Sequence, residues 1–124
     1  VVTSNMFGDI LSNLAAELAG GLGVAGSLNA GDSCAVAQAS HGSAPSLAGR
    51  NVANPAALIL STAMLIGWLG RRDDNVAAID AAVRLEAAVD AALGTEAGRT
   101  PDLGGAATTR QAAEAVVAEL GRSA

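Results

Sequence analysis

The stretch from His41 to Pro55 concentrates the residue types that most often surround a bound small molecule. It contains the only histidine, two of the three prolines, two glycines and several hydroxyl and amide side chains. Glycine lets a ligand approach the backbone closely, and serine hydroxyls both donate and accept hydrogen bonds. Long irregular segments next to regular elements are common places for function. We therefore predict a loop that wraps a small polar ligand, whose identity the spacing leaves open.

Other chemistry at this loop has less support. The chain has one histidine and one cysteine, so a zinc site or a Cys–His nucleophile pair is not favoured. A structural histidine that hydrogen-bonds the backbone is the more frequent alternative for His41. The charged run from Arg99 to Asp102 is interpreted as a simple surface turn in front of the last helix.

Asp9 and Asn13 are the side chains that best suit a hard divalent cation. They lie four residues apart on a predicted helix, so both project from one face. Carboxylate and amide oxygens suit Mg²⁺ or Mn²⁺, and Asp9 is expected in the first helical turn, where the helix dipole favours an anion. Two oxygens alone hold such an ion weakly, so further ligands must come from elsewhere. A helix-start aspartate with a polar neighbour is the alternative.

The elements that position these residues follow from the hydrophobic pattern. We predict the end of a strand at 1–3, helices at 7–19, 55–69, 75–93 and 108–120, and short strands at 24–30 and 34–39. The helix at 55–69 is apolar nearly all round, which predicts burial on most sides, inside a larger domain or against a partner. Asn54 is predicted to cap this helix and Pro55 to occupy its first position.

Two shorter signals mark where helices begin and end. The polar run at 70–75 is predicted to be a turn, in which Asp73 or Asp74 caps the next helix. Gly121 is predicted to stop the last helix.

The segment Gly21–Gly26 matches the dinucleotide fingerprint G-x-G-x-x-G letter by letter. That fingerprint requires a strand before it and a helix after it, so that the helix N-terminus meets the pyrophosphate. Here a helix is predicted before the glycines, and no helical period follows them. We therefore attribute the match to a helix stop and a turn into a strand.

Composition limits the classes of partner. The 124 residues suit one domain, and the net charge of −5, with seven arginines and no lysine, argues against a nucleic-acid partner. The single cysteine excludes an internal disulfide and fits a reducing cytoplasm. No signal peptide is visible, and the run at 55–69 is shorter than the roughly 20 residues of a membrane span. The abrupt start Val1–Thr3 is typical of an excerpt from a longer protein.

Several motifs occur in a fixed order along the chain. They are NMFGDILSN at Asn5–Asn13, HGSAP at His41–Pro45, AG at Ala48–Gly49, ANP at Ala53–Pro55 and RTPDLGG at Arg99–Gly105. Together they resemble the C-terminal third of the isocitrate/isopropylmalate dehydrogenase family, the metal-dependent β-decarboxylating dehydrogenases. The resemblance covers nearly all of the chain. It implies that residues 1–124 are the C-terminal portion of one α/β, non-Rossmann domain, a part that is mostly helical with a few short strands.

The resemblance also implies an activity and its site residues. The reaction is hydride transfer from a 2-hydroxy (di)carboxylic acid, such as 3-isopropylmalate, to NAD(P)⁺, usually with loss of CO₂. The implied cofactor-binding residues are His41, Gly42, Ser43, Ala44, Ser46 and Asn54, of which Asn54 reads adenine. Asp9 and Asn13 match the positions of ligands for Mg²⁺ or Mn²⁺. The helix at 7–19 resembles the family's dimer interface, so a homodimer is expected.

Three departures from the family pattern bear on this assignment. A second acidic metal ligand is usual at position 13, where this chain has Asn13. Position 46 is usually aspartate in NAD users, and lysine followed by tyrosine in NADP users, whereas this chain has Ser46-Leu47, so NAD is only slightly favoured. The catalytic tyrosine and lysine and the substrate arginines lie in regions that the chain lacks. A non-catalytic module that only dimerises is therefore the alternative.

Overall fold

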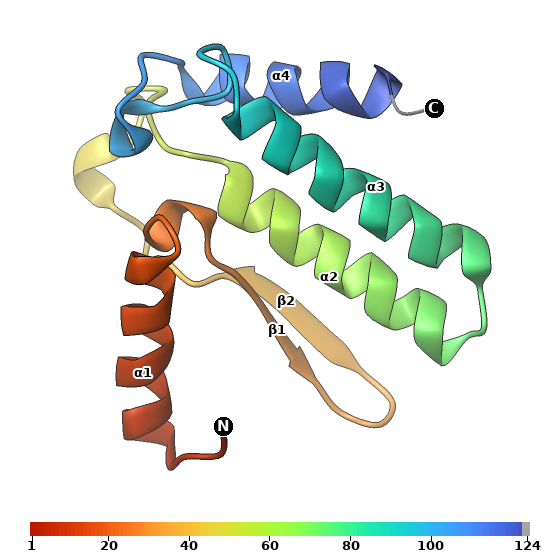
Figure 1. The fold of residues 1–124 in the computed structure, drawn as a ribbon. Coiled ribbons are helices and arrows are strands. Elements are labelled where there is room, and N and C mark those ends of the chain that lie inside the picture. Colours follow the sequence, from red (N-terminus) through yellow and green to blue (C-terminus); the bar gives the residue numbers. More distant parts are fainter. Residues whose placement is uncertain (123–124) are drawn as a thin grey trace.

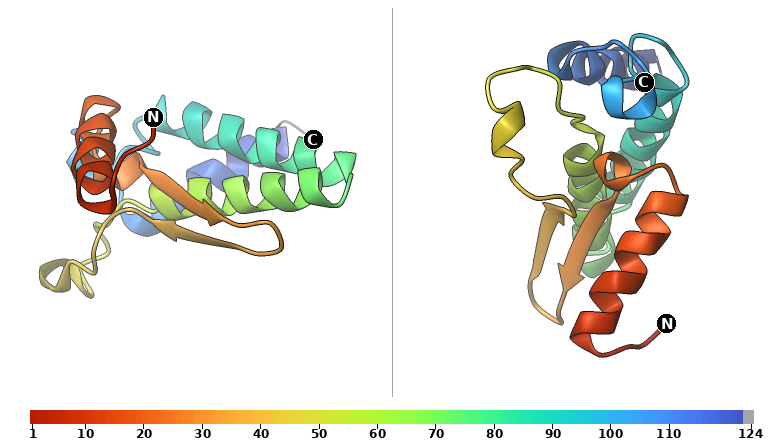
Figure 2. Two further views of the ribbon diagram at one scale, coloured as in Figure 1. Left: turned by 90° about the horizontal axis from the view of Figure 1, so that it is seen from below. Right: turned by 90° about the vertical axis from the view of Figure 1, so that its left-hand side faces the viewer.

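The computed structural model describes residues 1–122, which form helices and one β-hairpin (Figures 1 and 2). The helices are α1 (Asn5–Leu18), α2 (Ala56–Arg72), α3 (Val76–Leu93) and α4 (Thr109–Arg122). The strands are β1 (Gly26–Ala30) and β2 (Ala35–Ala39), and the 3₁₀ turns are η1 (Leu22–Val24), η2 (Pro45–Leu47) and η3 (Pro101–Leu103). The mostly helical architecture with two short strands confirms the predicted fold class.

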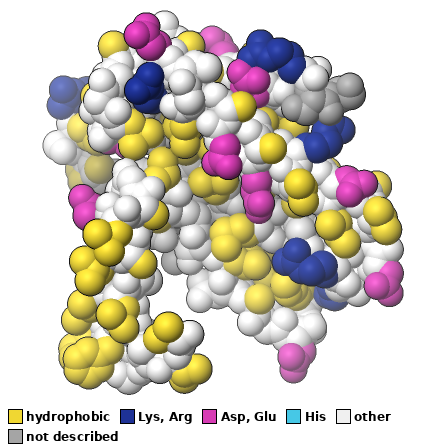
Figure 3. All heavy atoms as spheres, viewed as in Figure 1, with side chains coloured by type: hydrophobic (Ala, Val, Ile, Leu, Met, Phe, Trp, Pro, Cys, Tyr) yellow, Lys and Arg dark blue, Asp and Glu magenta, His cyan; other side chains and the backbone are white. Residues whose placement is uncertain are grey.

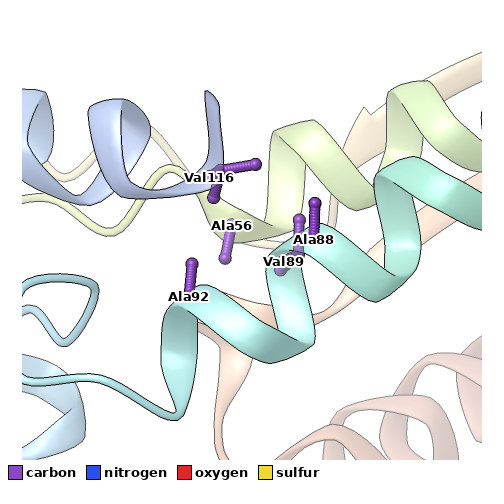
Figure 4. Close-up of a cluster of buried hydrophobic side chains, with 5 residues drawn as sticks. All are labelled: Ala56, Ala88, Val89, Ala92 and Val116. Atoms are coloured by element: carbon purple, nitrogen blue, oxygen red, sulfur yellow. The ribbon is translucent and has the colours of Figure 1, made fainter. Parts of the chain in front are cut away.

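Helix α2 lies at the centre, with α3 on one side and the hairpin on the other, and α4 packs on α3. The core between these helices consists of small side chains, as Figure 4 shows for Ala56, Ala88, Val89, Ala92 and Val116. Small side chains let helix axes approach closely, but each buries little apolar area. The alanine-rich centre of this core therefore packs closely, and larger side chains such as Ile59, Leu60 and Leu85 pack partly buried against it.

The hairpin is held on α2 by a buried hydroxyl. Strands β1 and β2 are antiparallel, in a register that runs from Gly26 opposite Ala39 to Ala30 opposite Ala35. The fully buried Ser61 Oγ accepts a hydrogen bond from the Ser27 amide at 3.1 Å and lies 2.7 Å from the Gln38 carbonyl oxygen. This contact fixes the point at which the chain leaves β2 for the long loop that precedes α2.

The sequence predicts that a larger domain or a partner buries α2, and the structure shows that α3 and the hairpin already bury part of it. Its buried positions carry small residues, and they face α3 and the hairpin. The larger side chains Leu58, Met64 and Leu69 are the exposed ones. Pro55 precedes the helix rather than starting it, although the Asn54 side chain accepts the Ala56 N–H as predicted.

The element with few partners is α1. None of its residues is buried, and its main contact is with η1. Its apolar side chains are 48% to 82% exposed and gather along one helix, as Figure 3 shows; they are Met6, Phe7, Ile10, Leu11, Leu14 and Leu18. The predicted strand end at 1–3 is wrong, because a strand needs a neighbour to complete its ladder and neither described strand pairs with this segment.

Three predicted helix ends are also wrong. Helix α2 does not end at Leu69 but continues through Gly70 to Arg72. Gly70 is buried and close to Ile79 of α3, so this glycine allows helix packing instead of marking a turn. Asn75 rather than Asp73 or Asp74 caps α3, and its side chain accepts the Ala78 N–H at 3.2 Å. Gly121 lies inside α4. Within residues 1–122, no helix has both the length and the apolar character that crossing a bilayer requires.

Candidate functional site

The loop between β2 and α2 surrounds a cavity with a volume of about 690 Å³. Sites for small molecules fall in the range of roughly 300 to 1,000 Å³. Five of the six residues predicted to bind the cofactor line this cavity: His41, Gly42, Ser43, Ala44 and Asn54. The structure therefore brings them around one space, which Gly23, Asp102 and Thr109 also line.

Backbone conformation shapes this loop. Ala44 has a φ of 41° and Asn51 a φ of 55°, both in the left-handed region that L-residues rarely adopt. An alanine there costs roughly 1–2 kcal/mol, and such strain tends to gather at ligand sites. The turn η2 follows directly, closed by the Leu47 amide donating to the Ala44 carbonyl at 2.9 Å. His41 Nδ1 lies 2.9 Å from the Gly42 carbonyl oxygen.

The sixth predicted residue, Ser46, is not brought to the cavity. It lies on η2 with its side chain exposed, while Leu47 after it faces the cavity. The 3₁₀ turn places successive residues on different sides, so the position that the family resemblance assigns to the ribose is on the outside here.

Asn54 is held at both ends of its amide. Its Oδ1 accepts the Ala56 N–H at 2.9 Å, which satisfies a free donor at the start of α2. Its Nδ2 donates to Asp102 Oδ2 at 3.0 Å. Two neighbours of opposite hydrogen-bonding character thus define which end of the amide is which.

The interpretation of Arg99–Asp102 as a simple surface turn is wrong. Thr100 is fully buried, and its Oγ1 donates to Asp102 Oδ1 at 2.5 Å. Asp102 thereby accepts from both Thr100 and Asn54 and also lines the cavity. The spacing Thr100-Pro101-Asp102 could have indicated this contact, because a turn at a proline can bring the hydroxyl and the carboxylate on either side of it together.

The start of α4 is tied to the same loop. The Thr109 amide donates to the Asn51 carbonyl at 3.0 Å, and its Oγ1 donates to the Ala53 carbonyl at 2.6 Å. Sequence reasoning missed Thr109, because its partners lie more than fifty residues away and no local pattern marks them.

Asp9 and Asn13 line a different hollow of about 410 Å³ between α1 and the hairpin. Asp9 is the fifth residue of α1, so it does not lie in the first turn, and the helix-dipole argument for it is wrong. Within the described residues, no group of three or more histidine, cysteine or acidic side chains is placed to hold a metal ion. One carboxylate and one amide suit Mg²⁺ chemically, but they form at most part of a coordination sphere.

Residues 1–116 match the family described as isocitrate/isopropylmalate dehydrogenase. The chain belongs to this family. It is 54% identical over 121 residues to the isocitrate/homoisocitrate dehydrogenase of Thermus thermophilus, covering 97% of this chain and 34% of the relative. It is 42% identical over 120 residues to the 3-isopropylmalate dehydrogenase of Methanothermobacter thermautotrophicus, covering 97% and 34%.

Solved structures agree with this assignment. The isocitrate dehydrogenase of Methylococcus capsulatus superposes with a TM-score of 0.81 at 42% identity, over 94% of this chain and 33% of that one. The chain thus spans about a third of the length of the relatives it matches. These comparisons confirm the family resemblance and the fold. The relatives carry different substrate names, so membership alone does not select one substrate.

Proposed function

We propose that the chain is the C-terminal, cofactor-binding portion of a dehydrogenase that oxidises a 2-hydroxy (di)carboxylic acid with NAD(P)⁺, usually with decarboxylation. The observation that carries this proposal is the gathering of His41, Gly42, Ser43, Ala44 and Asn54 around one cavity of about 690 Å³. These are the positions to which the family resemblance assigns the adenosine and diphosphate. The cavity volume suits part of a dinucleotide.

The lining favours NAD over NADP. Within residues 1–122, no lysine or arginine lines this cavity, whereas the carboxylate of Asp102 does. A 2′-phosphate in this cavity would meet a carboxylate and, among the described residues, no cation. When bound, the nicotinamide accepts the hydride, and the residues of this chain hold and orient its adenosine end.

The proposed ion is Mg²⁺ or Mn²⁺, with Asp9 and Asn13 as ligands from this chain. When bound, such an ion polarises the hydroxyl and carboxylate of the hydroxy acid. The remaining ligands come from the substrate, water or another copy of the protein. The exposed apolar face of α1, beside this hollow, fits the homodimer that the resemblance implies. A cytoplasmic location remains part of the same proposal.

A hybrid enzyme tests this function. Residues 1–124 replace the matching third of the Thermus thermophilus relative, and the parent enzyme is the control. The folded hybrid is expected to reduce NAD⁺ with isocitrate, homoisocitrate or 3-isopropylmalate in the presence of Mg²⁺ or Mn²⁺. A folded hybrid that reduces neither NAD⁺ nor NADP⁺ with any of the three acids would refute the proposal.

A second candidate function is a non-catalytic dimerisation module, which the neutral Asn13 and the outward-facing Ser46 favour. The double substitution Asn13→Asp and Ser46→Asp in the hybrid separates the two candidates. A weakened enzyme should gain affinity for Mn²⁺ from Asn13→Asp and for NAD⁺ from Ser46→Asp, because each change restores the carboxylate that the family resemblance implies at that position. A scaffold should gain neither affinity.

A further inference from the structure

Asn54 presents a defined pair of hydrogen-bonding groups to the cavity. An asparagine amide has two N–H donors and an oxygen with two lone pairs. Ala56 N–H occupies one lone pair and Asp102 Oδ2 occupies one N–H. One N–H and one lone pair of this amide therefore remain for a ligand. An asparagine contacts adenine with one N–H and one lone pair, at a ring nitrogen and an amino group.

The orientation of that amide decides which purine fits. A 6-amino purine offers a donor to the amide oxygen, whereas a 6-oxo purine offers an acceptor at the same place. Asp102 can only accept, so it holds Nδ2 on its own side and Oδ1 away from it. Thr100 donates from a fully buried position to the other carboxylate oxygen, which in turn fixes Asp102.

Gly23 makes room for this pair. A Cβ on Gly23 would lie 2.5 Å from Asp102 Oδ2 and 3.3 Å from Asn54 Nδ2, so one of the two partners would have to move. Gly23 is the second glycine of the G-x-G-x-x-G segment, which no dinucleotide fingerprint explains in this chain. The closeness of Asp102 and Asn54 to this position explains why the chain has a glycine there.

We propose that Asp102 is a positioning residue that orients the Asn54 amide for a 6-amino purine, and that Gly23 must lack a side chain for the pair to form. This inference rests on the proposed function, because it assigns the Asn54 end of the cavity to the adenine of the dinucleotide. Neither residue is catalytic. Both act on a ligand contact made by Asn54.

The test measures equilibrium binding to the folded hybrid, so it does not depend on turnover. The probes are NAD⁺ and its 6-oxo analogue, nicotinamide hypoxanthine dinucleotide. Asp102→Ala is expected to reduce the preference for NAD⁺ over this analogue by about tenfold, the effect of about 1.4 kcal/mol of lost discrimination. Asp102→Asn is expected to restore most of the preference, because its amide oxygen can still accept from Asn54.

Gly23→Ala should reduce the same preference in the wild-type background and much less in the Asp102→Ala background, where the carboxylate it displaces is already absent. Gly121→Ala serves as the matched control, since nothing lies within 4 Å of a Cβ there. A purely structural role for Asp102 would weaken both dinucleotides equally, and that result would overturn the inference. So would full additivity of the two substitutions. Failure of the unmutated hybrid to bind NAD⁺ would instead overturn the proposed function itself.

Discussion

Two glycines one turn apart on α2 allow a sharp test of how closely α2 and α3 pack. A Cβ on Gly70 would lie 2.8 Å from Ile79 Cγ1 and 2.9 Å from the Ile79 backbone nitrogen. A Cβ on Gly67 would meet only side-chain atoms, the nearest at 3.3 Å, from Ala82 and Arg71. The same substitution to alanine therefore meets rigid backbone at one position and side chains at the other.

The sizes of two opposing effects, helix propensity and overpacking, decide whether each substitution stabilises or destabilises the protein. Replacing glycine by alanine inside a helix gains up to about 1 kcal/mol of helix propensity. Overpacking a filled contact costs about 1–3 kcal/mol. For Gly70→Ala the clash with the Ile79 backbone should win, with a net destabilisation of about 1–2 kcal/mol. For Gly67→Ala the two effects should cancel to within about 0.5 kcal/mol, because the Arg71 end can move aside.

Thermal unfolding followed by far-ultraviolet circular dichroism measures both variants. Gly70→Ala should lower the Tm by about 4–8 °C for a chain of this size, and Gly67→Ala should leave it within about 2 °C. Gly121→Ala, which adds a methyl group in open space on α4, is the control for propensity alone. The reasoning fails if Gly70→Ala is as stable as Gly67→Ala, because the two helices would then be further apart than the structure places them.

Other residues give independent predictions. Thr100→Val removes a fully buried hydroxyl donor and should destabilise the protein by about 1–2 kcal/mol in urea unfolding, whereas Thr100→Ser should cost less; equal costs would contradict this role for the hydroxyl. Ile10→Asp with Leu14→Asp should shift sedimentation of the hybrid towards the monomer, and an unchanged mass would exclude this face of α1 from the interface. Hydrogen bonds from the Arg72 guanidinium hold the pKa of Asp73 below its ordinary value of 3.8. This ion pair therefore stabilises the folded protein above pH 3.8, and the stabilisation is lost as pH falls through the lower folded pKa of Asp73. Asp73→Asn should make the free energy of unfolding depend less steeply on pH below about pH 4. An unchanged pH dependence in that range would contradict this prediction.

Local patterns predicted the elements well where the hydrophobic periodicity agreed with the turn and capping residues. The helix predicted at 75–93 is Val76–Leu93, and the strand predicted at 34–39 is Ala35–Ala39. The patterns failed where tertiary packing decided the outcome. Gly70 has the residue type of a turn, yet it continues a helix because α3 packs directly against it.

The candidate site divides in the same way. The residues of the loop lie in one segment, so a local pattern of glycine, serine and proline was enough to single them out. Asp102 is 48 residues from Asn54, and no period or composition connects them. Ser46 differs from the other loop residues, because the sequence does not determine on which side of a 3₁₀ turn a side chain lies.

Two consecutive residues at the end of β2 border the two hollows in which the metal and the cofactor are proposed to bind. Ser40 lines the hollow that contains Asp9, and the next residue, His41, lines the larger cavity. Ser61 holds β2 on α2 just before this point, through the carbonyl of Gln38. The lining of one hollow therefore continues directly along the chain into the lining of the other. The proposed dehydrogenase must hold its hydroxy acid beside its dinucleotide, and this continuity of the two linings suits that requirement, which a dimerisation module does not have.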